Sequence, residues 1–302
     1  MEQLKNFLIW LKNEGKDEKT ISAYKTTVGQ FLEWVSGTYD EKPLSEIKPI
    51  EIKEYIGYMK HTLNRKQATV NKATASLKTY FVYLANNGEI SDNPMTRIKI
   101  QKVQSSEQIG ETGVSKWMTK EEQDRFISYL DLEKNEFKRL RNLAIIDVML
   151  YSGLRVAEVE ELKVDDVKVN GDVTLTIREG KKGKYSTVTL VSKHNRNLRN
   201  WLKQRQALTD DRYVQSPYLF VSERTGQLTS RGIQVMLDKY AKLARMDNVT
   251  PHRLRHSFCK NLANSGASIE IIRRLARHEN IQTTAIYIDP SHQEQINALR
   301  KM

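Results

Sequence analysis

The sequence has almost no cysteine and no long apolar run. Cys259 is the only cysteine among 302 residues, so no disulfide can form within the chain. A reducing cytoplasm is therefore the expected location. No apolar stretch approaches the roughly 20 residues that cross a bilayer, which excludes a membrane-spanning protein. At the N-terminus, leucines and Phe7 alternate with lysines, a pattern typical of an amphipathic helix and not of a signal peptide.

Acidic residues are also scarce in particular stretches. Lys and Arg number 49 against 37 Asp and Glu, which gives a net charge of +12 and favours a polyanionic partner such as nucleic acid. No acid occurs between Glu54 and Glu89, and between Pro251 and His278 six basic residues accompany a single acid, Glu270. A solvated face normally mixes the two signs, whereas stretches of one sign suit contacts with phosphates.

The hydrophobic pattern predicts two mostly helical halves. Residues 1–95 contain several apolar stripes with helical spacing, among them Val28, Phe31 and Val35, and form the predicted N-terminal domain. Residues 96–116 are polar and lack this period, which is typical of a linker. Residues 117–302 are again mainly helical, but the β-like runs 173–177 and 187–191 flank a lysine-rich hairpin tip. The predicted fold class is therefore mainly α with a small antiparallel β-sheet, in two domains.

One polar face of the N-terminal half predicts a DNA contact. Lysines, an arginine and short hydrogen-bonding side chains gather there without any acid, which suits phosphate contacts and groove readout better than a merely solvated face. The predicted DNA-binding residues are Lys60, Arg65, Lys66, Asn71, Lys72 and Lys78.

The C-terminal half carries the residues suited to chemistry. His252 and Arg255 lie in the run His-Arg-Leu-Arg-His, and His278 and Tyr287 follow. Arginines, imidazoles and one hydroxyl nucleophile without a cluster of carboxylates make a poor metal site and a good site for a phosphodiester. Guanidinium groups grip phosphate oxygens with fixed geometry, and a tyrosine can attack the phosphorus to form a covalent intermediate.

Taken in order, these motifs resemble those of the tyrosine recombinase family, which includes phage integrases and Xer-type recombinases. The resemblance covers nearly the whole chain: the runs 20–24 and 93–94 look like the opening and close of the family's core-binding domain, and the run 152–158 looks like the segment that carries its first arginine. It implies a helical core-binding domain, an α+β catalytic domain, and catalytic roles for Arg155, Lys181, His252, Arg255, His278 and the nucleophile Tyr287.

The catalytic lysine and the residue before His278 are the two positions at which the match to the family pattern is incomplete. Lys181 matches the family's catalytic lysine, which would protonate the leaving 5′ oxygen, but Lys182 and Lys184 compete for the role. The family usually has glycine before the third-box histidine, whereas this chain has Arg277. His256 is interpreted as a packing residue or a support for the catalytic groups.

The resemblance implies a site-specific DNA recombinase that cleaves and rejoins strands through a 3′-phosphotyrosine and a Holliday junction. Its partners would be double-stranded DNA and three further copies of itself, a homo-tetramer on two paired sites, with room for accessory DNA-binding proteins. No cofactor or metal is expected. The first predicted helix begins almost at residue 1, which favours a simple recombinase of the Xer or transposon-resolution kind. Residues after Pro290 are expected to dock on a neighbouring protomer or to fold back on their own domain.

Three alternatives stay open at this point. A type IB topoisomerase uses similar chemistry but rejoins the same strand, and a catalytically silent regulator would bind DNA without cutting it. A zinc site on His252, His256 and Cys259 has helical spacing, but the neighbouring cations disfavour a dication. The target sequence, and the choice between integration, excision and resolution, are not encoded in any motif.

Overall fold

The computed structural model describes residues 2–40, 42–101, 115–178, 185–288 and 300. The chain divides into two compact units, residues 1–108 and 109–302, which are treated separately below. Most of the predicted linker, 102–114, lies outside the described residues, so the predicted boundaries at 95 and 117 stay predictions. Among the described helices, none is long and apolar enough to cross a membrane.

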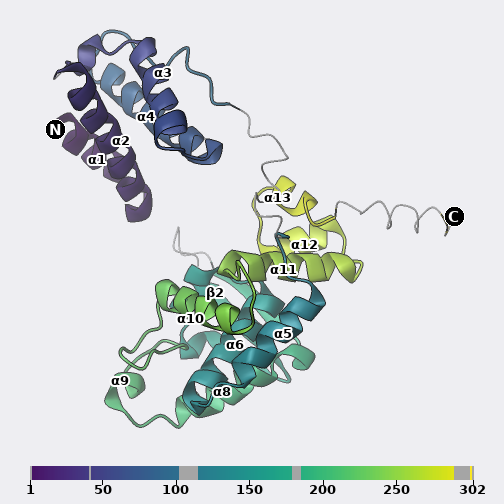
Figure 1. Cartoon of the computed structure of the whole chain (residues 1–302). Coiled ribbons are helices and arrows are strands. Elements are labelled where there is room, and N and C mark those ends of the chain that lie inside the picture. Colours follow the sequence, from purple (N-terminus) through teal and green to yellow (C-terminus); the bar gives the residue numbers. More distant parts are fainter. Residues whose placement is uncertain (1, 41, 102–114, 179–184, 289–299, 301–302) are drawn as a thin grey trace. The chain divides into compact units, whose positions relative to one another are not determined.

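The first unit is a small helical bundle (Figure 1). Its second helix begins at a cap in which Asp17 accepts a hydrogen bond of 2.8 Å from the amide of Thr20. The predicted stripe of Val28, Phe31 and Val35 is buried, although the helix runs beyond Gly37. The helices are α1 (Glu2–Asn13), α2 (Glu18–Tyr39), α3 (Pro49–Gly57), which continues into a π-helical turn (Tyr58–Thr62), and α4 (Gln67–Asn86).

Aromatic side chains fill the core of this unit. The Phe7 ring meets Tyr80 edge-on at 5.0 Å between centroids, and Phe31 meets Tyr55 in the same way at 5.1 Å. Edge-to-face pairs of this kind are favourable beyond the area that they bury. The aromatic pairs thereby tie α1, α2, α3 and α4 together and hold the polar side of α4 at the surface.

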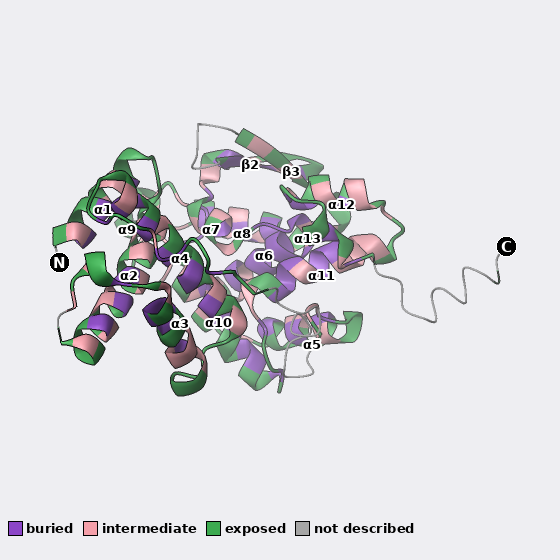
Figure 2. Ribbon diagram, turned by 90° about the horizontal axis from the view of Figure 1, so that it is seen from above, coloured by how far each residue is buried: buried purple, intermediate pink, exposed green. Residues whose placement is uncertain are grey.

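The second unit is built around one buried helix. Every residue of α6 from Arg141 to Leu150 is buried, and Figure 2 shows this helix in purple among more exposed neighbours. Helices α8 and α11 pack against it. A capping box of Thr119 and Glu122 starts α5. The helices are α5 (Lys120–Asp131), α6 (Glu136–Ser152), α7 (Val156–Glu161), α8 (Arg196–Gln206), α9 (Asp211–Val214), α10 (Ser230–Leu243), α11 (Pro251–Asn264), α12 (Ile269–Ala276) and α13 (Gln282–Ala285).

A three-stranded antiparallel sheet completes this unit, in the order β1 (Val167–Asn170), β2 (Asp172–Arg178), β3 (Tyr185–Leu190). The predicted hairpin is confirmed, with Leu175 opposite Val188. Inward-facing Val173, Leu175 and Ile177 alternate with more exposed residues along β2. The first strand was not predicted, because it is short and largely exposed and has no buried alternation to reveal it.

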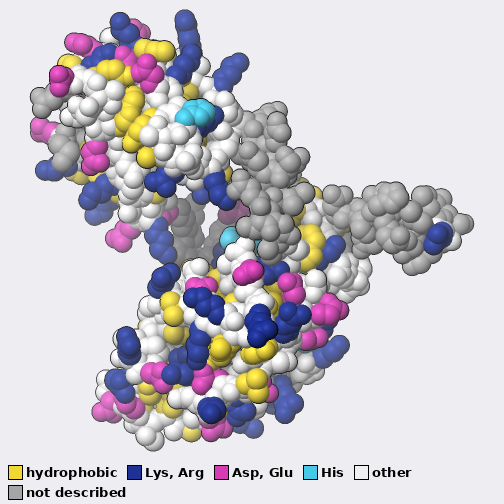
Figure 3. Space-filling model, in the orientation of Figure 1, with side chains coloured by type: hydrophobic (Ala, Val, Ile, Leu, Met, Phe, Trp, Pro, Cys, Tyr) yellow, Lys and Arg dark blue, Asp and Glu magenta, His cyan; other side chains and the backbone are white. Residues whose placement is uncertain are grey.

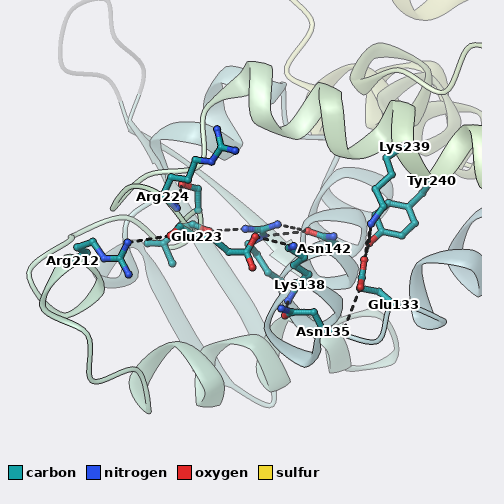
Figure 4. A network of polar contacts seen from close by, with 12 residues as sticks. Glu133, Asn135, Lys138, Asn142, Arg212, Glu223, Arg224, Lys239 and Tyr240 are labelled. Carbon is teal, nitrogen blue, oxygen red and sulfur yellow. Dashed lines mark hydrogen bonds and ion pairs between the residues drawn. The ribbon is translucent and has the colours of Figure 1, made fainter.

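A polar network stabilises the connection between α5, α6 and α10 (Figure 4). Glu133 accepts a hydrogen bond of 2.8 Å from the Lys239 ammonium group and a second bond from the Tyr240 hydroxyl. These donors lower the pKa of the Glu133 carboxyl to about 2. On the same side, the Lys138 ammonium group lies 2.8 Å from the Glu223 carboxylate. The network joins α10 to the segment between α5 and α6.

Candidate active site

Arg255 connects three segments that are far apart in the sequence. It lies on α11, which begins at a cap where Thr250 Oγ1 accepts from the amide of Arg253 at 3.1 Å. The Arg255 guanidinium donates hydrogen bonds to the carbonyl oxygens of Gly153 and Ala276, and the residue is only 4% exposed. Burial, and secondly the positive charge of Arg155, lower its pKa to about 10. Arg255 thus joins the turns that precede Arg155 and His278.

Arg155 is held at the start of α7. Gly153 ends α6 in the left-handed region, with φ 63°, and the chain then reverses. The Arg155 side chain is 50% exposed, and its guanidinium donates to Glu158 Oε1 at 3.0 Å. Its backbone amide donates to Glu158 Oε2 at 2.6 Å. Glu158 therefore orients an exposed guanidinium group at the start of α7.

His278 lies in the turn after α12 and is buried. Its Nδ1 atom is 2.9 Å from the Thr284 hydroxyl, which fixes the ring. Burial, followed by the positive charges of Arg255 and Arg155, lowers its pKa to about 4. The imidazole is therefore neutral at neutral pH, and these charges act on it at short range. His278, Arg155 and Arg255 form one electrostatic cluster.

Tyr287 is buried beside this cluster, with 1% of its surface exposed. It packs with Phe258, Cys259 and other apolar residues of the C-terminal helices. Its hydroxyl and the Nδ1 atom of His256 form a hydrogen bond. Burial, with a smaller effect of the Cys259 thiol, raises the pKa of Tyr287, so the phenol keeps its proton at neutral pH.

His256, which the sequence predicts to be a packing residue or a support for the catalytic groups, is the direct hydrogen-bond partner of Tyr287. Burial and the nearby His252 lower the pKa of His256 to about 4. In the sequence, His256 follows His252 by one helical turn, which puts both on one face of α11 but does not show the contact with Tyr287.

The two remaining predicted catalytic residues are His252 and Lys181. His252 is exposed, and its ring stacks on His256 with 5.2 Å between centroids. Lys181 lies outside the described residues, as do Lys182 and Lys184, so only the strands that lead to this hairpin tip are described. In the part of the chain that the structure describes, no three His, Cys, Asp or Glu residues are grouped to hold a metal ion.

The predicted DNA-binding residues lie in the first unit. Lys60 Nζ donates to Gln101 Oε1 at 2.8 Å, and Asn71 Nδ2 donates to the Gln101 carbonyl at 2.8 Å. These contacts border a hollow of about 370 Å³ whose lining includes Lys53 and Arg97. The remaining predicted contacts are exposed: Arg65, Lys66, Lys72 and Lys78. Figure 3 shows basic side chains on the visible face of this unit with some acids among them.

Comparisons with known proteins agree with one another along most of the chain. Residues 116–294 match the family model described as the phage integrase family, and residues 4–88 match the phage integrase N-terminal SAM-like domain. A TnP I resolvase of Bacillus thuringiensis is 31% identical over 96% of both chains. A tyrosine recombinase XerC of Leptospira interrogans is 26% identical over 99% of this chain and 92% of its own.

Solved structures extend the likeness to the fold. The XerH site-specific recombinase, solved bound to its difH substrate, matches 99% of this chain and 83% of its own with a TM-score of 0.74 and 22% identity. A lambda integrase dimer on a core site matches 97% of this chain and 96% of its own, with a TM-score of 0.71 and 17% identity. At these identities the likeness concerns the fold, which agrees with the predicted two-domain, mainly helical architecture.

Proposed function

The chain belongs to the phage integrase family and is a site-specific DNA recombinase, and we propose that Tyr287 attacks the scissile phosphate. Four further side chains are proposed to bind that phosphate: Arg155, Arg255, His252 and His278. The observation that carries this proposal is the position of Arg255, whose bonds to Gly153 and Ala276 bring the segments of Arg155 and His278 together. Two guanidinium groups next to the neutral imidazole of His278 are suited to a phosphodiester that gathers negative charge during in-line attack.

The reaction needs two proton movements. The Tyr287 oxygen forms a bond to phosphorus while the bond to the 5′ oxygen breaks, which leaves a 3′-phosphotyrosine and a free 5′ hydroxyl. Because the pKa of Tyr287 is raised, its proton must leave during the attack, and neutral His256 and His278 lie beside it. We assign the proton delivered to the 5′ oxygen to Lys181. Attack by the 5′ hydroxyl of another strand reverses the bond and exchanges strands through a Holliday junction.

Double-stranded DNA would lie against the acid-free face of the first unit. Residues Arg65, Lys72 and Lys78 are exposed there and are available to phosphates. Lys60 and Asn71 are hydrogen-bonded to Gln101, so DNA contact by these two residues requires exchange of those hydrogen bonds.

We place the reaction in the cytoplasm, where bacterial relatives would meet their DNA. Among the possible reactions we favour resolution, because one relative is named a resolvase.

The proposed assembly is a homo-tetramer on two paired sites. Ile269, Ala285, Ile286 and Ile288 line an apolar hollow of about 450 Å³ in the second unit. Residues 291–299, which include Ile296 and Leu299, lie outside the described residues. We assign this segment of a neighbouring protomer to the hollow. Deleting it should leave binding of one protomer to a half site intact and abolish cooperative binding to a full site in gel-shift titrations; unchanged cooperativity contradicts the assignment.

The nucleophile is tested with a nicked suicide substrate, which traps a covalent adduct that survives denaturation. Wild-type protein and the control Tyr129→Phe, which changes an exposed tyrosine on α5, should form the adduct. Tyr287→Phe should not, and an adduct with this variant places the nucleophile elsewhere. EDTA should have no effect on the reaction.

Two further assays separate the remaining alternatives. Exchange of strands between two marked sites distinguishes recombination from topoisomerase activity, which the comparisons do not favour. A 5′-bridging phosphorothiolate has a leaving group that needs no proton, so it should restore cleavage to Lys181→Ala. Restoration of Lys182→Ala instead would move the assignment by one residue.

A further inference from the structure

Arg277 ends helix α12 in a backbone conformation that disfavours its side chain. Its φ and ψ are 54° and 48°, the left-handed region in which glycine is the usual residue after a helix. For a residue with a Cβ atom this conformation is unfavourable. Arg245 adopts the same conformation after α10, with φ 53°, but its side chain is exposed. Strain at such a position points to a contact that compensates for it.

The Arg277 guanidinium has such contacts. It donates to Glu158 Oε2 at 2.6 Å and to the Ser186 hydroxyl at 3.2 Å, and the side chain is only 12% exposed. Glu158 also accepts from the amide and guanidinium groups of Arg155. The ring closes because Arg155 Nη2 donates to the Arg277 carbonyl at 3.3 Å. Arg155, Glu158 and Arg277 therefore hold one another in place.

This ring also reaches the sheet. Ser186 lies on β3, directly after the hairpin tip, so Arg277 connects that strand to the turn that presents His278. Both terminal nitrogens of Arg277 are engaged, and its Nε atom is buried without a hydrogen-bond partner in the described structure. A group so enclosed is poorly placed to grip a phosphate directly.

We propose that Arg277 is a positioning residue for recombination: it fixes Glu158, and through Glu158 it fixes the orientation of Arg155 toward the scissile phosphate. The left-handed conformation brings its guanidinium group back across the turn to Glu158. The inference rests on the proposed role of Arg155. An arginine that contacts phosphate directly, or one that only stabilises the fold, is the competing interpretation.

The test compares Arg277→Gly with the matched control Arg245→Gly. Both changes relieve a left-handed arginine at the end of a helix, but only the first removes contacts with the site. Arg245→Gly should keep the wild-type rate of single-turnover cleavage on the suicide substrate. Arg277→Gly should cleave about 10- to 100-fold more slowly at saturating protein, because a small misplacement of a catalytic group costs up to about 10²-fold. Its melting temperature should stay close to that of the wild type.

A double-mutant cycle then identifies the route of the effect. If Arg277 acts through Arg155, adding Arg277→Gly to Arg155→Ala should slow cleavage no further, since the group that it positions is gone. Additive losses would indicate an independent contact and overturn the inference. Arg277→Lys, which keeps the charge but not the fork, should be intermediate between Arg277→Gly and wild type.

Other outcomes are equally decisive. If Arg277→Gly cleaves at the full rate while Arg155→Ala is impaired, the positioning role of Arg277 is refuted and the proposed role of Arg155 is not. Full cleavage by Arg155→Ala refutes the proposed function of that residue instead. If Arg277→Gly lowers the melting temperature and loses cleavage to a corresponding extent, Arg277 contributes only to the stability of the fold.

Discussion

Gly153 is the position where the fold and the candidate site depend most directly on one missing side chain. Its φ is 63°, and a Cβ atom built there would lie 2.3 Å from Cδ1 of Phe258. Gly153→Ala therefore combines two costs. The left-handed conformation costs an alanine roughly 1–2 kcal/mol, and overpacking a buried site costs about 1–3 kcal/mol. We expect the free energy of unfolding to fall by about 2–5 kcal/mol.

Gly171 supplies the matched control. Its φ is 72°, but a Cβ atom there would meet nothing within 4 Å. Gly171→Ala should therefore show the conformational cost alone, roughly 1–2 kcal/mol. The difference between the two variants isolates the collision with Phe258. Equal losses would refute the reasoning, because they would mean that the Phe258 ring moves aside at no cost.

The measurement is urea unfolding followed by tryptophan fluorescence. A background of Trp10→Phe and Trp34→Phe leaves Trp117 and Trp201, both in the second unit, as the only tryptophans. The signal then reports the unit that contains Gly153 and is not mixed with unfolding of the first unit. Cleavage by Gly153→Ala should fall even where the protein is still folded, because the carbonyl of this residue holds Arg255.

Three further predictions concern charge. Burial raises the pKa of Asp147 to about 6, so its stabilising contribution is complete at low pH and is lost as the pH rises through 6. Relative to Asp147→Asn, the wild type should lose about 1.4 kcal/mol of unfolding free energy between about pH 5 and pH 7.5 in urea titrations; a constant difference contradicts this. In the free protein, the His256 and His278 resonances should titrate near pH 4 in NMR spectra, and midpoints near 6.5 would contradict their burial. Arg155→Ala and Arg255→Ala should each slow cleavage about 10²–10³-fold, but only the buried Arg255→Ala should also lower the melting temperature.

The sequence predicted the elements whose signals are local. The stripe on α2 and the hairpin of β2 and β3 each depend on residues close together in the chain, and both are confirmed. The strand β1 was missed because its four residues carry no burial pattern. Local sequence patterns do not predict such a strand, because it forms by pairing with the neighbouring strand β2.

For the candidate site, the sequence likewise predicted the residue types but not their hydrogen-bond partners. Motif order predicted catalytic roles for a set of four residues, because side-chain types can be read directly from a sequence. The four are Arg155, Arg255, His278 and Tyr287. The hydrogen-bond partners of these residues could not be predicted. Arg255 donates to carbonyl groups of residues that are 102 and 21 positions away, and since every residue has a carbonyl group, the sequence does not mark these two. The pairing of His256 with Tyr287 spans 31 positions and depends on where α13 ends. Side-chain chemistry can be predicted from sequence, whereas backbone partners require the fold.

The contacts of Arg255 explain why the fold and the proposed reaction make opposite demands on this residue. Burial lowers the pKa of its guanidinium, so the charge that a phosphate requires is costly to bury in the free protein. The two carbonyl groups offset part of that cost, and they are also the groups that align the turns before Arg155 and Arg277. An anion bound at the site adds the missing negative charge. Binding a phosphodiester should therefore stabilise the second unit in proportion to the charge that it neutralises, and a chain without Arg255 should lose this stabilisation together with cleavage.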